Sequence, residues 1–302
     1  MELRARDFVI VGRDDEINNR IKTIDRNLWM HQEVMPPFIA ATILGLIVLG
    51  CILANVITYR EPSFMDYAHT NVSPNYDFAM GTDSMGRDIA AMVWFGGRVS
   101  LFIGVVSTLI STSLGILYGT ISGLSHRWLD EIMMRITDIL LSIPSILMLL
   151  FLQGLVGCDT PLRMAILIGI TRWVPISKIV RTEVIHLKNS DFVVASRGLG
   201  GGFFHILLKH LFPNFIWSIM FMIVTDVGTA IGLESTLSFL GLGLPLEVIS
   251  WGSMLSLAET AILSNHWWII VIPGLFLIST LVCITDIGNY IRKINHAKFN
   301  HL

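Results

Sequence analysis

Three ionisable side chains lie in or beside strongly apolar stretches of the chain, where a charge is costly. Arg172 interrupts the fourth apolar run, Asp226 lies within the fifth, and Glu234 lies at its end. Ionisable residues inside a membrane span usually face the interior of a helix bundle or a water-filled cavity. We therefore predict that these three residues line a polar pathway, where Arg172 would be able to meet a carboxylate. The alternative is that Arg172 and Glu234 lie near enough to the span ends to reach water.

A second set of polar residues forms the stretch GTDSMGRD, residues 81–88. Asp and Thr side chains in a Gly-rich turn typically cap a following helix, and this structural role is the favoured interpretation. Metal binding by Asp83 and Asp88 is disfavoured, because no further ligands cluster in the sequence around them.

Several common catalytic and ligand motifs are absent from the sequence. It contains no GxxxxGK[ST] phosphate loop, no HExxH, no GxSxG and no CxxC, so we expect neither a catalytic residue nor a metal site, and no ATP hydrolysis by this chain. Cys51, Cys158 and Cys283 lie in or beside apolar segments and are expected to be small buried hydrophobes. The net charge of −2 argues against nucleic acid as a partner.

The composition is that of an integral membrane protein. The 302 residues are 53% hydrophobic and 15% charged, with a mean hydropathy of +0.67, whereas an average soluble domain is about 25% charged. A span needs roughly 20 mostly apolar residues. The sequence predicts about six, over residues 38–59, 99–124, 139–157, 161–180, 214–234 and 267–287. The first apolar run is too long for a signal peptide and follows a hydrophilic arm, so we expect it to be retained.

The distribution of basic residues predicts the orientation of these spans. With the N-terminus inside the cell, seventeen lysine and arginine residues lie on the inner side and four lie on the outer side. Since inner loops are enriched in such residues, both termini are expected to be cytosolic.

The stretch DFVVASRGLGGGFFHILLKHLFPN, residues 191–214, lies on the predicted cytosolic side between two spans. Asp191 lies near the N-terminus of a predicted short helix that ends at Arg197, where an acidic residue is favourable. Glycines then allow a sharp turn, and an amphipathic stretch, residues 203–211, leads back to the membrane.

This stretch resembles the signature loop of the permease subunits of ATP-binding-cassette importers of the type I fold. In that family the loop forms short helices that dock into a groove on a separate ATPase subunit. The pattern departs from the family at Val194, where a glutamate is missing, and Gly201 and Gly202 lengthen the glycine run. The resemblance implies that the ATPase-coupling residues are Asp191, Ala195, Ser196, Arg197, Gly198, Leu199, Gly200 and Pro213.

Further motifs resemble the second permease of the dipeptide, oligopeptide and nickel branch of this family. The resemblance covers residues 80–292 and, because several motifs occur in order, it is more specific than the loop alone. In this family the position of Arg172 usually carries a small residue. The matching segments are 81–88, GRVSL at 97–101, MRITDI at 134–139, SIP at 142–144, SFLGLG at 238–243 and SWG at 250–252.

The resemblance implies an all-α membrane protein with the type I importer permease fold, located in the bacterial cytoplasmic membrane. Its expected partners are a homologous second permease, two ATPase subunits that hold ATP and Mg²⁺, an extracytoplasmic substrate-binding protein and the lipid bilayer. This chain itself would hold no cofactor. The expected organisation is a cytosolic arm (1–35), a first span (36–59), an extracytoplasmic segment (60–96), a transmembrane domain (97–292) with its coupling loop at 186–212, and a cytosolic tail (293–302).

The sequence leaves alternatives open both for the transported cargo and for the class of membrane protein. A peptide is the first choice of cargo, and nickel or a metal–chelator complex is the second. A secondary transporter driven by an ion gradient would use Arg172, Asp226 and Glu234 as a coupling relay, but it leaves the cytosolic Gly-rich loop unexplained. A membrane scaffold without transport is the third class.

Overall fold

The computed structural model describes residues 36–245 and 247–299, so the predicted arm at 1–35 lies outside the described part. The described residues are almost entirely helical and contain no strand, only an isolated bridge between Thr82 and Asp88. The fold is that of an all-α membrane protein. Its elements are α2 (Phe38–Ile52), α3 (Ala54–Ile57), η1 (Tyr67–His69), α4 (Ile89–Leu124), α5 (Arg127–Ser142), α6 (Ser145–Val156), α7 (Pro161–Leu187), α8 (Asp191–Gly198), α9 (Phe203–Ile206), η2 (Leu207–Leu211), α10 (Phe212–Phe239), α11 (Trp251–Leu255), α12 (Ala258–Leu263) and α13 (Trp268–Phe299).

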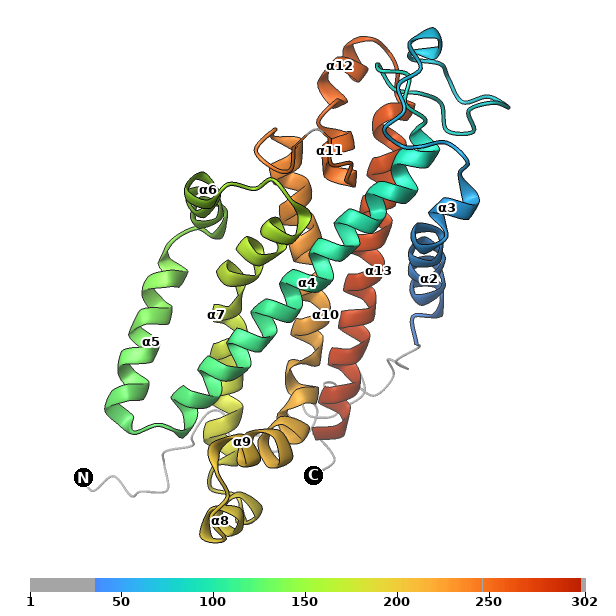
Figure 1. The fold of residues 1–302 in the computed structure, drawn as a ribbon. Helices are drawn as coiled ribbons and strands as arrows, with labels where there is room; N and C mark the ends of the chain where they lie inside the picture. Colours follow the sequence, from blue (N-terminus) through green and yellow to red (C-terminus); the bar gives the residue numbers. More distant parts are fainter. Residues whose placement is uncertain (1–35, 246, 300–302) are drawn as a thin grey trace, which may run out of the picture. The chain divides into compact units, whose positions relative to one another are not determined.

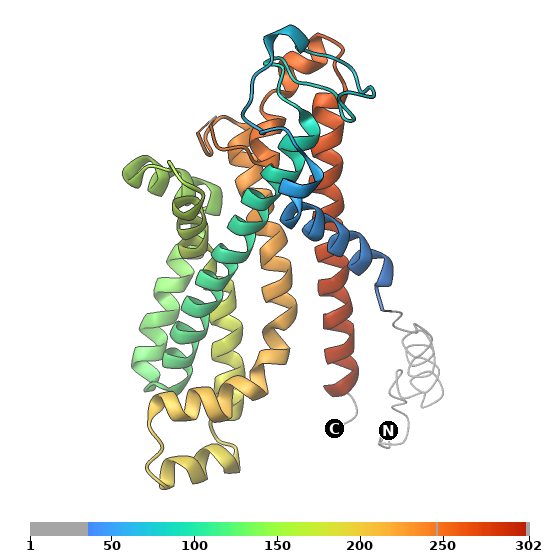
Figure 2. The same cartoon turned by 45° about the vertical axis from the view of Figure 1, so that its right-hand side comes forward.

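The long helices α4, α7, α10 and α13 run side by side (Figure 1). Helices α8 and α9 lie at one end of this group, which we call the loop end. Residues 60–88, α11 and α12 lie at the opposite end, and Figure 2 shows the same separation from a second side. Helix α13 finishes at the loop end in both views.

Glycines of α4 allow the close packing of α4 against α7. Gly115, Gly119 and Gly123 recur every four residues on one buried face of α4. A Cβ atom at Gly115 would lie 2.8 Å from Cβ of Ile176, and one at Gly123 would lie 2.7 Å from Cγ1 of Val184. This spacing of small residues lets the backbones of two membrane helices approach closely.

The predicted third span is wrong as a single helix. Within residues 139–157 the chain bends by 89° between α5 and α6. Pro144 explains the break, because proline has no N–H to donate and forces the preceding residue out of the helical region. Ile143 accordingly has an extended backbone, with φ −89° and ψ 125°.

The other predicted spans correspond to helices with different bounds. Helix α4 begins at Ile89, ten residues before the predicted start at 99, and so reaches into the expected extracytoplasmic segment. Three helical stretches of the described residues, Ile89–Leu124, Phe204–Phe239 and Trp268–Ile294, are long and apolar enough to cross a membrane. The bent pair α5–α6 makes a fourth if it counts as one span, α2 is a shorter apolar helix, and α7 carries more charge.

Candidate functional site

The predicted coupling loop consists of α8, a glycine turn and α9, and it is attached firmly to the helices behind it. Val193 of α8 is fully buried, as is Leu211 of the π-helical turn η2. Both belong to a buried cluster that also contains Val184 of α7 and Phe215 of α10. The predicted short helix at 191–197 is therefore observed, and it is held in place by side chains on its inner face.

Two glycines of the turn meet different physical requirements. Gly200 has φ +83°, a backbone conformation that strains any residue with a side chain. Gly201 is needed for space, since a Cβ there would lie 2.8 Å from the carbonyl oxygen of Ser196. The N–H of Gly201 donates to that same carbonyl at 2.9 Å, which closes the C-terminus of α8.

The outer face of the loop exposes apolar side chains. Leu199 is 90% exposed and Val194 is 56% exposed. Most of their surface is left uncovered by the described part of the chain, although their neighbour Val193 is completely buried. The loop therefore presents an apolar surface on a rigid base.

The remaining predicted loop residues take several environments. Asp191 lies in the first turn of α8 and is exposed, as is Ala195, whereas Ser196 is buried. Pro213 is the second residue of α10 and is exposed. Gly198 ends α8 with open space around it, and the side chain of Arg197 lies outside the described part.

Arg172 of α7 forms an ion pair with Asp226 of α10. Its Nε donates to Oδ1 of Asp226 at 2.7 Å, and its Nη2 donates to Oγ1 of Thr229 at 3.0 Å. The second carboxylate oxygen of Asp226 accepts from Oγ of Ser111 at 2.7 Å. The pair thus joins α4, α7 and α10. The side chain of Arg172 is 23% exposed and paired with Asp226, so it does not simply extend into water as the alternative supposes.

Glu234 of α10 lies elsewhere, toward the opposite end from the loop, and is 0% exposed. The alternative, in which Glu234 is solvated at a span end, is wrong. Among the described residues no ion pair involves Glu234; its carboxylate accepts hydrogen bonds from Ser100, Ser235, Ser238 and Ser250. The assignment of Arg172, Asp226 and Glu234 to a pathway stays a prediction.

The GTDSMGRD stretch forms the capping structure predicted for it. Oδ1 of Asp83 accepts from the backbone N–H groups of Met85 and Arg87, while its Oδ2 pairs with the guanidinium of Arg87 at 2.7 Å. Asp88 caps α4 by accepting from the N–H of Ala90. Burial raises the pKa of the Asp88 carboxyl, and that hydrogen bond opposes the rise.

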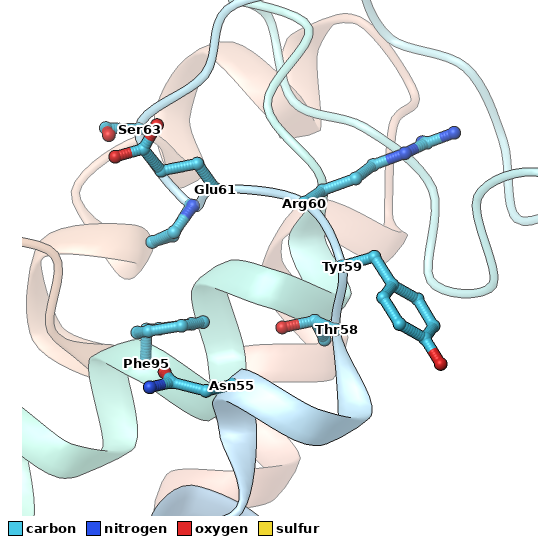
Figure 3. Close-up of a pocket in the computed structure, with 8 residues that line it drawn as sticks. Asn55, Thr58, Tyr59, Arg60, Glu61, Ser63 and Phe95 are labelled. Carbon is cyan, nitrogen blue, oxygen red and sulfur yellow. The ribbon is translucent and has the colours of Figure 1, made fainter.

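A pocket of about 450 Å³ opens where α3 leads into the following loop. Figure 3 shows Asn55 and Phe95 on one side of it and Glu61 and Ser63 on the other, while Tyr59 and Arg60 point away. The guanidinium of Arg60 lies over the ring of Phe78, 4.0 Å from its centroid. The residues that line this pocket do not include Arg172, Asp226 or Glu234.

Sequence reasoning missed two groups of residues that the structure places beside the predicted ones. Ser100, Ser238 and Ser250 lie within the matched segments GRVSL, SFLGLG and SWG, but nothing in those segments indicates that their hydroxyls meet at one carboxylate. The glycine series of α4 could have been found from its four-residue spacing. Free Cys51, Cys158 and Cys283 are buried, as predicted.

Residues 115–293 match a protein family described as binding-protein-dependent transport system inner membrane component. A protein of Brucella suis named as a peptide permease is 37% identical over 83% of this chain and 85% of its own. The dipeptide transport system permease protein of Bacillus subtilis is 37% identical over 72% of this chain and 68% of its own. The oligopeptide transport system permease protein of the same organism is 38% identical over 82% of both chains.

Proposed function

The chain belongs to the family of binding-protein-dependent transport system inner membrane components, and on this premise we propose that it forms half of the pathway of an ATP-driven peptide importer. The names of its relatives, which refer to peptide, dipeptide and oligopeptide transport, support peptide cargo over nickel. As a multi-pass protein of the cytoplasmic membrane it would work with a second permease and a substrate-binding protein. Two ATPase subunits would hold ATP and Mg²⁺ and carry out hydrolysis.

The observation that carries this proposal is the loop 191–211. It combines a buried base, a turn fixed by Gly200 and a tip where Leu199 is 90% exposed. An exposed apolar side chain on a rigid element suits insertion into a groove of a partner. We assign this groove to the ATPase subunit, so that closure of the ATPase dimer on ATP would displace the loop and, through it, α10.

A secondary transporter would use the three charged residues differently. A proton or ion relay from Asp226 to Glu234 needs groups that exchange partners along the path. Eight residues separate the two carboxylates along α10, which is about 12 Å at 1.5 Å per residue. Asp226 is paired with Arg172 and Glu234 with serines, and family membership favours the ATP-driven class.

Replacement of Leu199 tests the coupling role. Leu199→Asp places a charge where an apolar contact is proposed, and because the site is exposed the chain itself should keep its stability. We expect the permease pair to purify normally but to retain much less ATPase subunit in detergent, with peptide uptake reduced in parallel. The matched control is Leu263→Asp, since Leu263 is 81% exposed on α12 at the opposite end. Full ATPase retention by the Leu199→Asp complex would contradict the coupling role.

The orientation of the chain is tested by thiol labelling. In a background with Cys51, Cys158 and Cys283 replaced, single substitutions Gly198→Cys and Leu242→Cys place thiols at exposed sites at the two ends. A membrane-impermeant reagent added to intact cells should label only the second. Labelling of the first alone would reverse the proposed topology.

A further inference from the structure

The coupling loop and the opposite end of the molecule are joined by one continuous helical stretch. Residues Phe204–Phe239 form a single span through η2 and α10, about 54 Å long at 1.5 Å per residue. Glu234 lies five residues before the end of this stretch. Residues 240–245 and 247–255 follow, ending in α11, and we call them the outer segment.

Glu234 is the point where the outer segment meets the helices. Oε1 of its carboxylate accepts from the hydroxyls of Ser250, at 2.7 Å, and Ser238, at 3.0 Å. Oε2 accepts from those of Ser100, at 3.2 Å, and Ser235, at 3.3 Å. One carboxylate thereby connects α4, α10 and the outer segment.

Backbone N–H groups of the outer segment orient these hydroxyls. The N–H of Trp251 donates to Oγ of Ser100 at 3.2 Å, and the N–H of Ser253 donates to Oγ of Ser250 at 3.0 Å. A hydroxyl that accepts from an N–H still has its own O–H to donate, and here the Glu234 carboxylate receives it. Because an ionised carboxylate is an acceptor only, it fits a site in which all four contacts are donors. Chains of hydrogen bonds of this kind strengthen one another in a buried setting.

Close backbone packing supports the same connection. A Cβ at Gly252 would lie 2.5 Å from Cα of Ser235, so α11 rests directly on the backbone of α10. Trp251 is fully buried, and its indole N–H donates to the carbonyl of Val93 in α4 at 2.9 Å. From the other side Gln153 of α6 donates to the carbonyl of Leu242. The outer segment has little freedom to move without α10.

We propose that Glu234 is a positioning residue that fastens the outer segment to α10, so that this segment follows the helix whose inner end carries the coupling loop. The carboxylate is 0% exposed and contacts four serine hydroxyls, so its positioning effect is exerted through these serines and the backbone that they hold. The outer segment faces the side on which a substrate-binding protein would dock. Glu234 would thus transmit the arrival of the binding protein to α10 and to the ATPase. This inference rests on the proposed function.

The test uses the complete complex in lipid vesicles, with Glu234→Gln as the main variant. Glutamine keeps the size of the side chain but replaces one acceptor oxygen by an N–H₂ group, so two serine hydroxyls lose their acceptor. Ser250→Ala is a milder second variant that removes one hydroxyl from the outer segment. The matched control is Ser279→Ala, because among the described residues the hydroxyl of Ser279 bonds only to backbone carbonyls of its own helix, α13.

Two readouts separate positioning from a general effect on folding. The first is the rate at which a thiol introduced by Leu242→Cys is labelled, and the second is ATPase activity with and without the binding protein. For Glu234→Gln we expect labelling to become several-fold faster. Stimulation by the binding protein should fall by about tenfold, the order expected for a lost hydrogen bond to a charged group. Basal ATPase activity and assembly should be kept.

Wild-type labelling and stimulation in both variants would overturn the inference, while intact peptide uptake would leave the proposed function standing. A parallel fall of basal activity, stimulation and melting temperature in both variants would also overturn it, since that pattern denotes a structural role. If the wild-type complex itself transports no peptide, the proposed function fails, and the labelling rates alone still decide whether Glu234 holds the outer segment.

Discussion

The coupling loop exposes apolar side chains, whereas the outer part of α10 buries a charged one. At the loop, Leu199 and Val194 expose apolar surface. Near the far end of the same helix, Glu234 buries a carboxylate with its hydrogen bonds made inside the chain. Exposed apolar groups are typical of a surface that another protein covers. Buried polar groups, in contrast, need hydrogen-bond partners within the same protein.

The coupling loop and the outer part of α10 should therefore be stabilised by different contacts. This part of α10 should be stable in the isolated permease, because its polar groups are paired with residues of α4 and α7 and with Ser250, which caps α11. The loop should gain its full stability only when a partner covers it. Substitutions in the two regions should therefore affect different measurements, and the three predictions that follow are arranged by the size of the expected change in stability.

The largest effect is expected from Arg172→Ala. This change leaves the Asp226 carboxylate, which is 8% exposed, without its cation. Breaking a buried pair in this way costs about 3 kcal/mol or more, so the melting temperature of the detergent-solubilised complex should fall clearly.

The control for Arg172 is the double variant Arg172→Met with Asp226→Leu, which removes both charges and should recover most of the lost stability. Equal melting temperatures of the wild type and Arg172→Ala would refute the importance of the ion pair. Peptide uptake by a stable double variant then tests the separate prediction that Arg172 meets the cargo.

An intermediate effect is expected at the contact between α11 and α10. Gly252→Ala should destabilise the complex by about 1–3 kcal/mol, the usual cost of overpacking, because the new methyl group would lie 2.5 Å from the backbone of Ser235. Gly232→Ala is the matched control in α10 itself, where no atom outside the local helix backbone lies within 4 Å of the added group. Thermal unfolding of both variants measures the difference. Similar melting temperatures would mean that α11 is not seated on α10 in the assembled protein.

The smallest effect on stability is expected in the loop. Gly200→Ala forces a side chain into φ +83°, at a cost of about 1 kcal/mol, and this cost should be confined to the turn. ATPase retention should fall more than the melting temperature does. Gly202→Ala has space for its methyl group and no positive φ, so it should retain the ATPase better. Equal retention by the two variants would show that the turn conformation is unimportant for docking.

The sequence was a good guide to this fold where the signal is local. The short helix beginning at Asp191, the glycine turn and the capping by Asp83 and Asp88 follow from residue types at fixed spacing, and all are observed. The helical bounds were less certain, because hydropathy marks the apolar part of a helix and not its polar ends. Helix α4 therefore begins before the predicted span. Pro144 breaks the predicted third span into α5 and α6, which hydropathy alone does not detect.

The candidate site was less predictable, since its partners are distant in sequence. Arg172 and Asp226 are 54 residues apart, and Ser100 lies 134 residues from Glu234. Each residue could be recognised as unusual from its apolar surroundings. Their pairing depends on how three helices pack, and a single sequence without that packing left solvation at the span ends as an equal alternative.

The π-helical turn at Leu207–Leu211 has a consequence for insertions and deletions. Pro213 lies two residues after it, and a proline has no N–H and crowds the carbonyl four residues before it, which a wider turn relieves. A π turn contains one residue more than the α turn it replaces, and each residue of an α-helix turns the chain by about 100°. Loss of one residue from this turn would therefore leave an ordinary α turn and keep residues 191–206 on the same side of α10. Loss of one residue elsewhere in α10 would instead rotate the loop by about 100° around the helix.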